Sequence, residues 1–272
     1  MQIDPSKRRS AAFLGALFIA GLTLSAGAQA ASWRFAIPPF FPKAELEKQY
    51  APLVEFLSAS TGEKFELVTS SNYLSYWDSA KKGGAYDLVI DNAPMIDFRV
   101  QRQNFKVLAK ITGVISQSVV TGEKTSIFDA GELAGKKVAA VPSPNLSALA
   151  MFQIFPNPMR QPDFIYADDA RAAIEMLQKN QVIAAIVPTP IAIQFPNLNL
   201  VSNTEQIPHL AFAAAPSMPA DVQNKVRQAL LSADQTAAGQ RALAALNTTR
   251  FEPANNANYQ GYAKWLEGTF GY

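Results

Sequence analysis

Cysteine is absent from the 272-residue sequence, and histidine occurs only once, at position 209. The first absence excludes a disulfide framework, a thiolate nucleophile and lipid attachment through cysteine. The second leaves no histidine pair for a metal centre, and no Gly-x-Ser-x-Gly elbow or glycine-rich nucleotide fingerprint occurs. We therefore expect no enzymatic activity, no cofactor and no metal.

The N-terminus has the pattern of an export signal. Basic residues at positions 7–9 precede the apolar run AAFLGALFIAGLTLSAGA, and the small residues of Ala28-Gln29-Ala30 close it. This order predicts a cleaved signal peptide over residues 1–30 and a periplasmic location for the mature chain. An N-terminal membrane anchor is the alternative, but the run is Gly- and Ala-rich and barely long enough to span a bilayer.

The charge of the mature chain is balanced. The whole sequence has 24 Lys+Arg and 22 Asp+Glu; residues 1–30 hold three of the former and one of the latter, which leaves 21 of each. A neutral protein has no electrostatic attraction to nucleic acid or to an anionic membrane surface. We expect neither as a partner.

Strand-like and helix-like segments alternate twice along the chain, first over residues 33–94 and again over residues 136–190. Each unit reads β-α-β-α-β, the pattern of an α/β sheet with helices on both faces. Residues 109–123 and 198–216 follow the two units and lack helical periodicity, so we expect them to cross between two lobes.

The predicted organisation has one lobe inserted in the other. Lobe 1 begins with residues 31–118, lobe 2 comprises residues 119–207, and residues 208–272 return to complete lobe 1. Ligands of such sheets bind outside the carboxyl ends of the strands, so the strand-to-helix joints should face a cleft between the lobes.

Three stretches carry a family resemblance: YAPLVEFLSASTGEKFELVTSSNY at 50–73, GAYDLVIDNAP at 84–94 and DDARAAIEMLQKNQVIAAIV at 168–187. The chain resembles the phosphate/phosphonate-type periplasmic solute-binding proteins of ABC transporters. The resemblance implies the two-lobed type II fold, in which each lobe is a mostly parallel sheet flanked by helices and the ligand cleft lies between them. It also implies a monomer whose partner is an ABC permease.

Candidate ligand-binding residues in lobe 1 follow its first three strands. They are Phe40 and Phe41, Asn72 and Tyr73, and Asp91 and Asn92. The resemblance implies that Tyr73 offers its hydroxyl and ring to the ligand, and an acidic Asp91 would favour a cationic group. For Phe40 and Phe41, packing between the lobes is an equal alternative.

In lobe 2 the joint SPNLS offers Ser143, Asn145 and Ser147. The resemblance implies that this joint holds an oxyanion, as an uncapped helix N-terminus can. Pro144 has no N–H to contribute, and Ser143 before a proline is also an ordinary N-cap, so simple capping is the alternative.

Two further candidates in lobe 2 are Asp168 and Thr189. Many family members carry a histidine where Asp168 stands, and a carboxylate there would repel an oxyanion. The alternative is that Asp168 and Asp169 cap the next helix. His209 is not expected to bind an anion.

These observations predict a receptor of an ABC importer that closes over a small organic anion such as a phosphonate, preferably one carrying an amine. The amine preference follows from Asp91 and Asp168. The alternative is a periplasmic sensing module that signals to a membrane receptor kinase.

Overall fold

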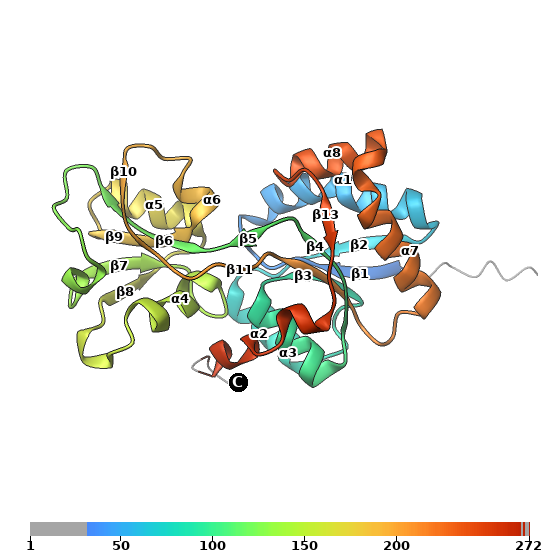
Figure 1. Ribbon diagram of the computed structural model, residues 1–272, viewed down its shortest axis with the longest axis horizontal. Helices are drawn as coiled ribbons and strands as arrows, with labels where there is room; N and C mark the ends of the chain where they lie inside the picture. The colour runs from blue at the N-terminus through green and yellow to red at the C-terminus, as the bar shows by residue number, and fades with distance from the viewer. Residues whose placement is uncertain (1–31, 268, 270–271) are drawn as a thin grey trace, which may run out of the picture.

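The computed structural model describes residues 32–267, 269 and 272, arranged as two lobes joined by crossing strands (Figure 1). The predicted signal peptide, residues 1–30, lies outside the described residues. No helix in the described part of the chain is both long and apolar enough to cross a membrane.

Lobe 1 is built on a six-stranded sheet in the order β13-β4-β12-β3-β1-β2. Its strands are β1 (Ser32–Ala36), β2 (Lys64–Val68), β3 (Leu88–Asp91), β4 (Lys106–Ile111), β12 (Ala211–Ala214) and β13 (Phe251–Pro253). The strands β2, β1 and β3 are parallel, whereas β12 runs antiparallel to β3 and β4.

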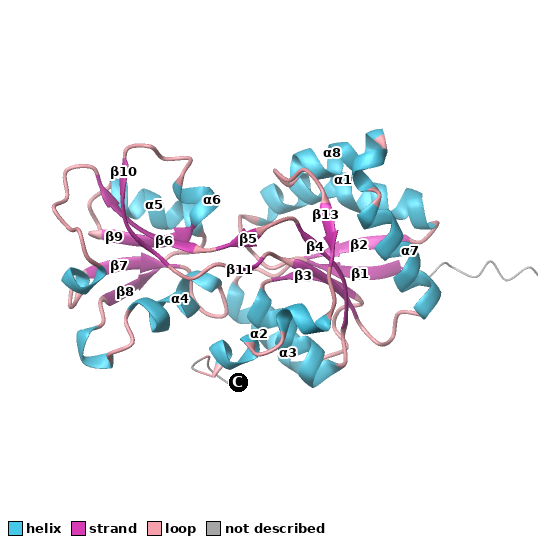
Figure 2. Cartoon of the chain, in the orientation of Figure 1, coloured by secondary structure: helices cyan, strands magenta, loops and turns pink. Residues whose placement is uncertain are grey.

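Helices cover both faces of this sheet (Figure 2). One face packs against α1 (Lys43–Thr61), α7 (Ala220–Leu231) and α8 (Ala237–Ala245), and the other against α2 (Tyr73–Lys82), α3 (Ala93–Gln103) and the short 3-10 helices η4 (Asn256–Tyr259) and η5 (Tyr262–Leu266). The buried side of α1 carries Leu46, Tyr50, Leu53 and Leu57, whose spacing places them on one helix face. Gly62, with φ of 72°, ends the helix in the left-handed conformation that glycine adopts readily.

Lobe 2 has a five-stranded sheet in the order β10-β6-β9-β7-β8. Its strands are β6 (Gln117–Gly122), β7 (Lys137–Ala140), β8 (Asp163–Tyr166), β9 (Ala184–Pro188) and β10 (Leu198–Asn203), and its helices are α4 (Leu146–Ile154), α5 (Ala170–Gln178) and α6 (Thr189–Ala192). One apolar cluster lies under α4 and another under α5, on opposite faces of the sheet. The remaining 3-10 helices are η1 (Ala130–Leu133), η2 (Pro158–Arg160) and η3 (Ala233–Gln235).

The two crossings pair with each other between the lobes, as β5 (Val114–Ile115) and β11 (Ile207–Pro208) in an antiparallel ribbon (Figure 1). The α/β two-lobed fold class is confirmed, but the sheets are mixed instead of mostly parallel. The reason is that each chain segment that crosses between lobes enters its new sheet antiparallel, as β6 does beside β9 and β12 beside β3.

The lobes also touch outside the crossing strands. Leu146 and Leu149 of α4 belong to an apolar cluster whose other members are lobe 1 residues together with Ile115 and Ile207 of the crossings. In addition, Asn92 Nδ2 donates a hydrogen bond to the carbonyl oxygen of Pro144 at 3.3 Å. The structure therefore has its lobes in contact around the cleft.

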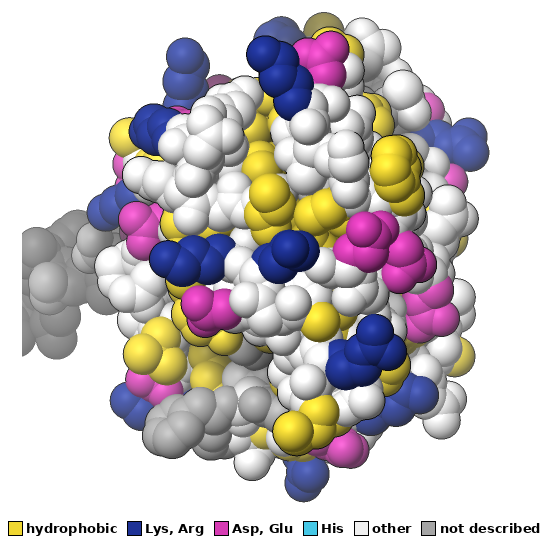
Figure 3. All heavy atoms as spheres, turned by 90° about the vertical axis from the view of Figure 1, so that its left-hand side faces the viewer, with side chains coloured by type: hydrophobic (Ala, Val, Ile, Leu, Met, Phe, Trp, Pro, Cys, Tyr) yellow, Lys and Arg dark blue, Asp and Glu magenta, His cyan; other side chains and the backbone are white. Residues whose placement is uncertain are grey.

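The outer end of lobe 2 shows acidic and basic side chains interspersed with small groups of hydrophobic ones (Figure 3). No patch of a single charge dominates this face, which agrees with the balanced charge of the sequence. This face therefore shows no surface that would attract a ligand or partner of one charge.

Candidate functional site

A cavity of about 470 Å³ lies between the lobes. Lobe 1 contributes Phe40 and Tyr50, lobe 2 contributes Asn145 and Ile191, and the crossing segments contribute residues such as His209. A cavity of this size is in the range of small-molecule sites. Because it is walled by both lobes and by the crossings, its shape depends on how the lobes are closed. We refer to it as the interlobe pocket.

Most of the interlobe pocket wall is apolar. Its apolar residues are Phe40, Phe41, Ile111, Ile115, Leu146, Ala170, Pro188, Pro190, Ile191, Ile193, Leu210 and Leu246. The other described residues of the wall are Gln49, Tyr50, Asn92, Gln117, Asn145, Gln194, His209 and Asn247. None of these described lining residues is an aspartate, glutamate, lysine or arginine.

His209 is a neutral imidazole in this wall. Burial, aided by the nearby Lys110 ammonium, lowers the pKa of His209 to about 4. Its Nδ1 accepts a hydrogen bond from the backbone N–H of Leu210 at 2.8 Å, which places the proton of the neutral ring on Nε2. His209 therefore offers the pocket a neutral donor, and no positive charge, at physiological pH.

The predicted anion joint of lobe 2 is arranged as a cap. Helix α4 begins at Leu146 and its N-cap is Asn145, whose Oδ1 accepts the backbone N–H of Ser147 at 2.8 Å. The expectation that Ser143 caps the helix is wrong, because its hydroxyl is instead 2.6 Å from that of Thr269. The Ser147 hydroxyl is buried and donates to Gln117 Oε1 at 3.0 Å. Of the three predicted residues, only Asn145 lines the pocket.

Tyr73 lies beside the pocket, and its hydroxyl makes no hydrogen bond. The residue is 2% exposed, its ring meets that of Phe40 edge-on at 6.4 Å, and its hydroxyl has no hydrogen-bond partner within bonding geometry. Burial raises the pKa of Tyr73 well above its ordinary value, and the neighbouring Asn145 side chain offsets part of that rise. A neutral phenol without a partner therefore sits next to two pocket-lining residues, Phe40 and Asn145.

Two other predicted binding residues, Asn72 and Thr189, have polar partners within the fold. Asn72 is exposed and caps α2 through a reciprocal pair of hydrogen bonds with Ser75. The Thr189 hydroxyl lies 2.8 Å from that of Ser116 and 2.9 Å from that of Ser118, while its neighbours Pro188 and Pro190 line the pocket. The structure thus gives both side chains local partners.

Asp91 does not present a free carboxylate to the pocket. It is fully buried and accepts hydrogen bonds from the Tyr76 hydroxyl at 2.5 Å and from Arg99 at 3.4 Å. The guanidinium of Arg99 is 1% exposed and lies 5.4–5.7 Å from the ring centres of three aromatic residues. We call Asp91, Arg99 and Tyr76 the buried ion cluster. The expectation of an acidic group available to a ligand amine is therefore corrected at Asp91.

Asp168 is exposed and does not line the pocket, whereas Asp169 is buried and caps α5 by accepting the N–H groups of Arg171 and Ala172. The capping alternative is thus correct for Asp169. Neither aspartate offers a carboxylate to a ligand amine, and the basis for an amine preference is lost.

Phe40, Phe41 and Asn92 are the lobe 1 predictions that line the pocket. Asn92 caps α3 by accepting the N–H of Met95 at 3.1 Å, and its Nδ2 reaches lobe 2. Sequence reasoning missed Gln49, Tyr50 and the residues of the crossings. The apolar spacing along α1 predicted Tyr50 as a core residue. No signal in the sequence showed that the buried face of α1 continues into the cleft.

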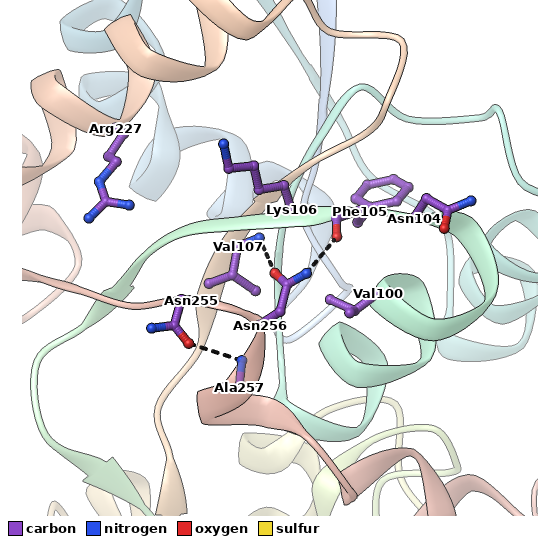
Figure 4. Close-up of a pocket in the computed structure, with 9 residues that line it drawn as sticks. All are labelled: Val100, Asn104, Phe105, Lys106, Val107, Arg227, Asn255, Asn256 and Ala257. Carbon is purple, nitrogen blue, oxygen red and sulfur yellow. Dashed lines mark hydrogen bonds between the residues drawn. The ribbon is translucent and has the colours of Figure 1, made fainter.

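A second hollow of about 540 Å³ lies on lobe 1 between the end of α3, the start of β4, α7 and η4 (Figure 4). Its central Asn256 side chain is used within the fold, since it accepts the N–H of Val107 and donates to the carbonyl of Phe105 (Figure 4). The hollow therefore marks the seam where the C-terminal segment docks on β4. In the described part of the chain, no group of three or more His, Asp or Glu side chains could hold a metal ion.

Comparison with known proteins finds one matching protein family. A family described as the periplasmic substrate-binding protein of phosphonate ABC transporters matches residues 35–259. No curated protein sequence matches the chain.

Solved structures share the fold at low identity. The binding-protein component of an ABC phosphonate transporter from Pseudomonas aeruginosa has a TM-score of 0.74 at 12% identity, over 85% of this chain and 83% of that one. PhnD1 of Prochlorococcus marinus in complex with methylphosphonate gives 0.75 at 16%, over 86% and 97%. A Xanthomonas citri protein bound to ATP gives 0.67 at 13%, over 87% and 100%. Ligands thus differ among proteins that share this architecture.

Proposed function

Because the chain belongs to the phosphonate-type family of periplasmic substrate-binding proteins of ABC transporters, we propose that it captures a small organic solute in the interlobe pocket and delivers it to a permease. The observation that carries the proposal is the pocket of about 470 Å³ walled by both lobes. A solute there contacts both lobes at once. It therefore binds the closed arrangement better than the open one and shifts the equilibrium toward closure.

The short ribbon of β5 and β11 is the proposed hinge. Arg171 of lobe 2 also meets lobe 1, with its guanidinium 4.9 Å above the Phe41 ring and 2.5 Å from the Glu45 carboxylate. Both charged side chains are partly exposed, so this ion pair contributes at most about 1 kcal/mol to closure. This ion pair therefore supplies little of the free energy of closure.

We further propose that residues 1–30 direct export and are removed, and that the mature protein acts as a monomer in the periplasm. Phosphonates are the reference ligand class because the family is named for them. The sequence-based preference for an amine-bearing phosphonate is withdrawn, since Asp91 and Asp168 do not line the pocket.

The test combines binding with closure. The purified protein is titrated with a panel of phosphonates, amides, alcohols and amino acids while thermal unfolding and small-angle scattering are recorded. A ligand at a hundred times its dissociation constant should stabilise the fold by about 2.7 kcal/mol and reduce the radius of gyration. The ligand should be recovered chemically unchanged, and deletion of the gene should abolish its uptake by cells.

Stabilisation without compaction would contradict closure, and conversion of the ligand would indicate an enzyme. Compaction with unchanged uptake would favour the sensing alternative.

A further inference from the structure

The interlobe pocket has the size and surface of a site for an apolar molecule. Its volume of about 470 Å³ equals roughly fifteen waters at about 30 Å³ each. A solute as small as methylphosphonate would leave most of that space to water against an apolar wall. Phe40, Phe41, Ile115, Leu146, Ile191 and Leu210 provide apolar surface from lobe 1, lobe 2 and the crossings. A larger apolar body would displace that water favourably.

The described wall of the pocket also has no charged side chain to hold an oxyanion. No described lining residue is charged, and the imidazole of His209 is neutral. The nearby cationic groups have anionic partners of their own, Arg99 with Asp91 and Arg171 with Glu45.

Three helices that begin at the cleft, α3, α4 and α5, have their N-termini capped by their own side chains. Asn92 Oδ1 takes the N–H of Met95, Asn145 Oδ1 takes that of Ser147, and the Asp169 carboxylate takes those of Arg171 and Ala172. Each cap places an oxygen acceptor where an anion would need a donor. The Asp169 carboxylate also directly precedes the lining residue Ala170 and would repel an anion there.

One unpartnered group in the pocket wall and one beside it define the polar end of a ligand. The Tyr73 hydroxyl is a donor in a side chain that is 2% exposed, and it lies near Tyr50 and Asn145, which line the pocket. Gln49 lines the pocket, and its Oε1 is a buried acceptor without a hydrogen-bond partner. A buried acceptor requires a donor from the ligand, which a fully ionised phosphonate does not have.

From the uncharged, mostly apolar wall of the pocket, the unpartnered Gln49 carbonyl in that wall and the Tyr73 hydroxyl beside it, we infer that the solute is an uncharged molecule with an apolar body and a head group that both donates and accepts hydrogen bonds. A primary amide or an alcohol has these properties. The inference rests on the proposed function and specifies its ligand class. It separates this chain from a receptor for phosphonate dianions, although the fold is shared.

The experiment compares ligands that share a cyclohexyl ring and differ in their polar head group, with methylphosphonate as a small reference. Dissociation constants of the purified protein are measured by calorimetry at fixed salt for cyclohexanecarboxamide, cyclohexylmethanol, cyclohexanecarboxylate, cyclohexylphosphonate and methylphosphonate. We expect the amide to bind at least tenfold more tightly than the carboxylate and either phosphonate, with the alcohol between them.

Two variants locate the head group. Tyr73→Phe keeps the ring and Gln49→Met keeps the length of the side chain, and each should weaken binding of the amide at least fivefold. Tyr166→Phe, an exposed tyrosine of β8, is the matched control and should leave binding unchanged.

Tighter binding of a phosphonate than of the amide would overturn the inference while leaving the receptor function intact. Binding of none of the five compounds would also overturn it, and the closure experiment on the wider panel would then decide the receptor function separately. Unchanged amide affinity in both Tyr73→Phe and Gln49→Met would refute the assigned head-group site.

Discussion

Two neighbouring regions at the carboxyl end of β3 use polar groups in opposite ways. In the buried ion cluster, Asp91, Arg99 and Tyr76 satisfy one another and are at most 1% exposed. In the interlobe pocket, the described lining residues are uncharged, and the Gln49 carbonyl and the adjacent Tyr73 hydroxyl have no partner. The comparison teaches that the charged groups of the ion cluster serve the scaffold, whereas the two unpartnered groups at the pocket are free to serve the proposed ligand.

The largest expected effect is on the ion cluster. Arg99→Leu leaves the Asp91 carboxylate buried without its cation, so we expect the free energy of unfolding to fall by about 3–5 kcal/mol. Arg102→Leu, which removes an exposed arginine of the same helix, is the control and should change it by less than about 0.5 kcal/mol. Denaturant unfolding measures both. Equal effects would show that Arg99 does not neutralise Asp91.

The next largest effect is the pH dependence that His209 gives to the free energy of unfolding. In the folded protein the pKa of His209 is about 4, below its ordinary 6.5, so the unfolded chain binds the extra proton first as pH falls. The stabilisation linked to the lowered pKa of His209 is fully present above pH 6.5. As pH falls from 6.5 to 4, the free energy of unfolding loses up to roughly 3 kcal/mol of it.

Unfolding free energies at pH 7 and pH 4.5 should show a smaller difference in His209→Gln than in the wild type. An identical difference would mean that the pKa of His209 is the same in the folded and the unfolded protein.

A third prediction contrasts two tyrosines on α2. Tyr76→Phe removes a hydroxyl that donates to Asp91 and accepts from Arg99, and we expect a loss of about 1–3 kcal/mol in unfolding free energy. Tyr73→Phe removes a hydroxyl without a partner, so stability should be unchanged or increased. Thermal unfolding of the ligand-free variants measures both stability changes. A large destabilisation by Tyr73→Phe would mean that this hydroxyl serves the fold.

The smallest expected effect comes from adding a charge to the pocket. Gln194 is an exposed lining residue, so Gln194→Lys should fold normally. Its ammonium should strengthen binding of cyclohexylphosphonate severalfold, equivalent to about 0.5–1 kcal/mol, and high salt should remove the gain. Gln194→Met is the uncharged control. The same gain with Gln194→Met would attribute the effect to packing.

The sequence predicted the lobes better than it predicted the site. Hydrophobic periodicity identified α1 and α5 because each helix packs one face on a single core, and continuous apolar runs identified buried strands such as β3, which packs both of its faces. It also identified the crossings, which lack that periodicity. Strand direction was not encoded locally, so the mixed sheets were missed.

Site residues were harder to predict because their roles depend on partners far away in the chain. Asp91 and Asn92 are consecutive, yet the first is enclosed by Tyr76 and Arg99 and the second lines the pocket. Likewise Ser143 pairs with Thr269, 126 positions away, while Asn145 caps α4. No spacing rule along the chain distinguishes these outcomes.

The most direct test of an uncharged ligand site is the identity of the solute that the protein itself retains. The protein is purified from periplasm under native conditions, examined by native mass spectrometry, and its released small molecule is identified. We predict a solute that is uncharged at neutral pH, with an apolar body and a hydroxyl or amide, and with reduced occupancy in Tyr73→Phe. Retention of a phosphonate or another oxyanion would contradict this account.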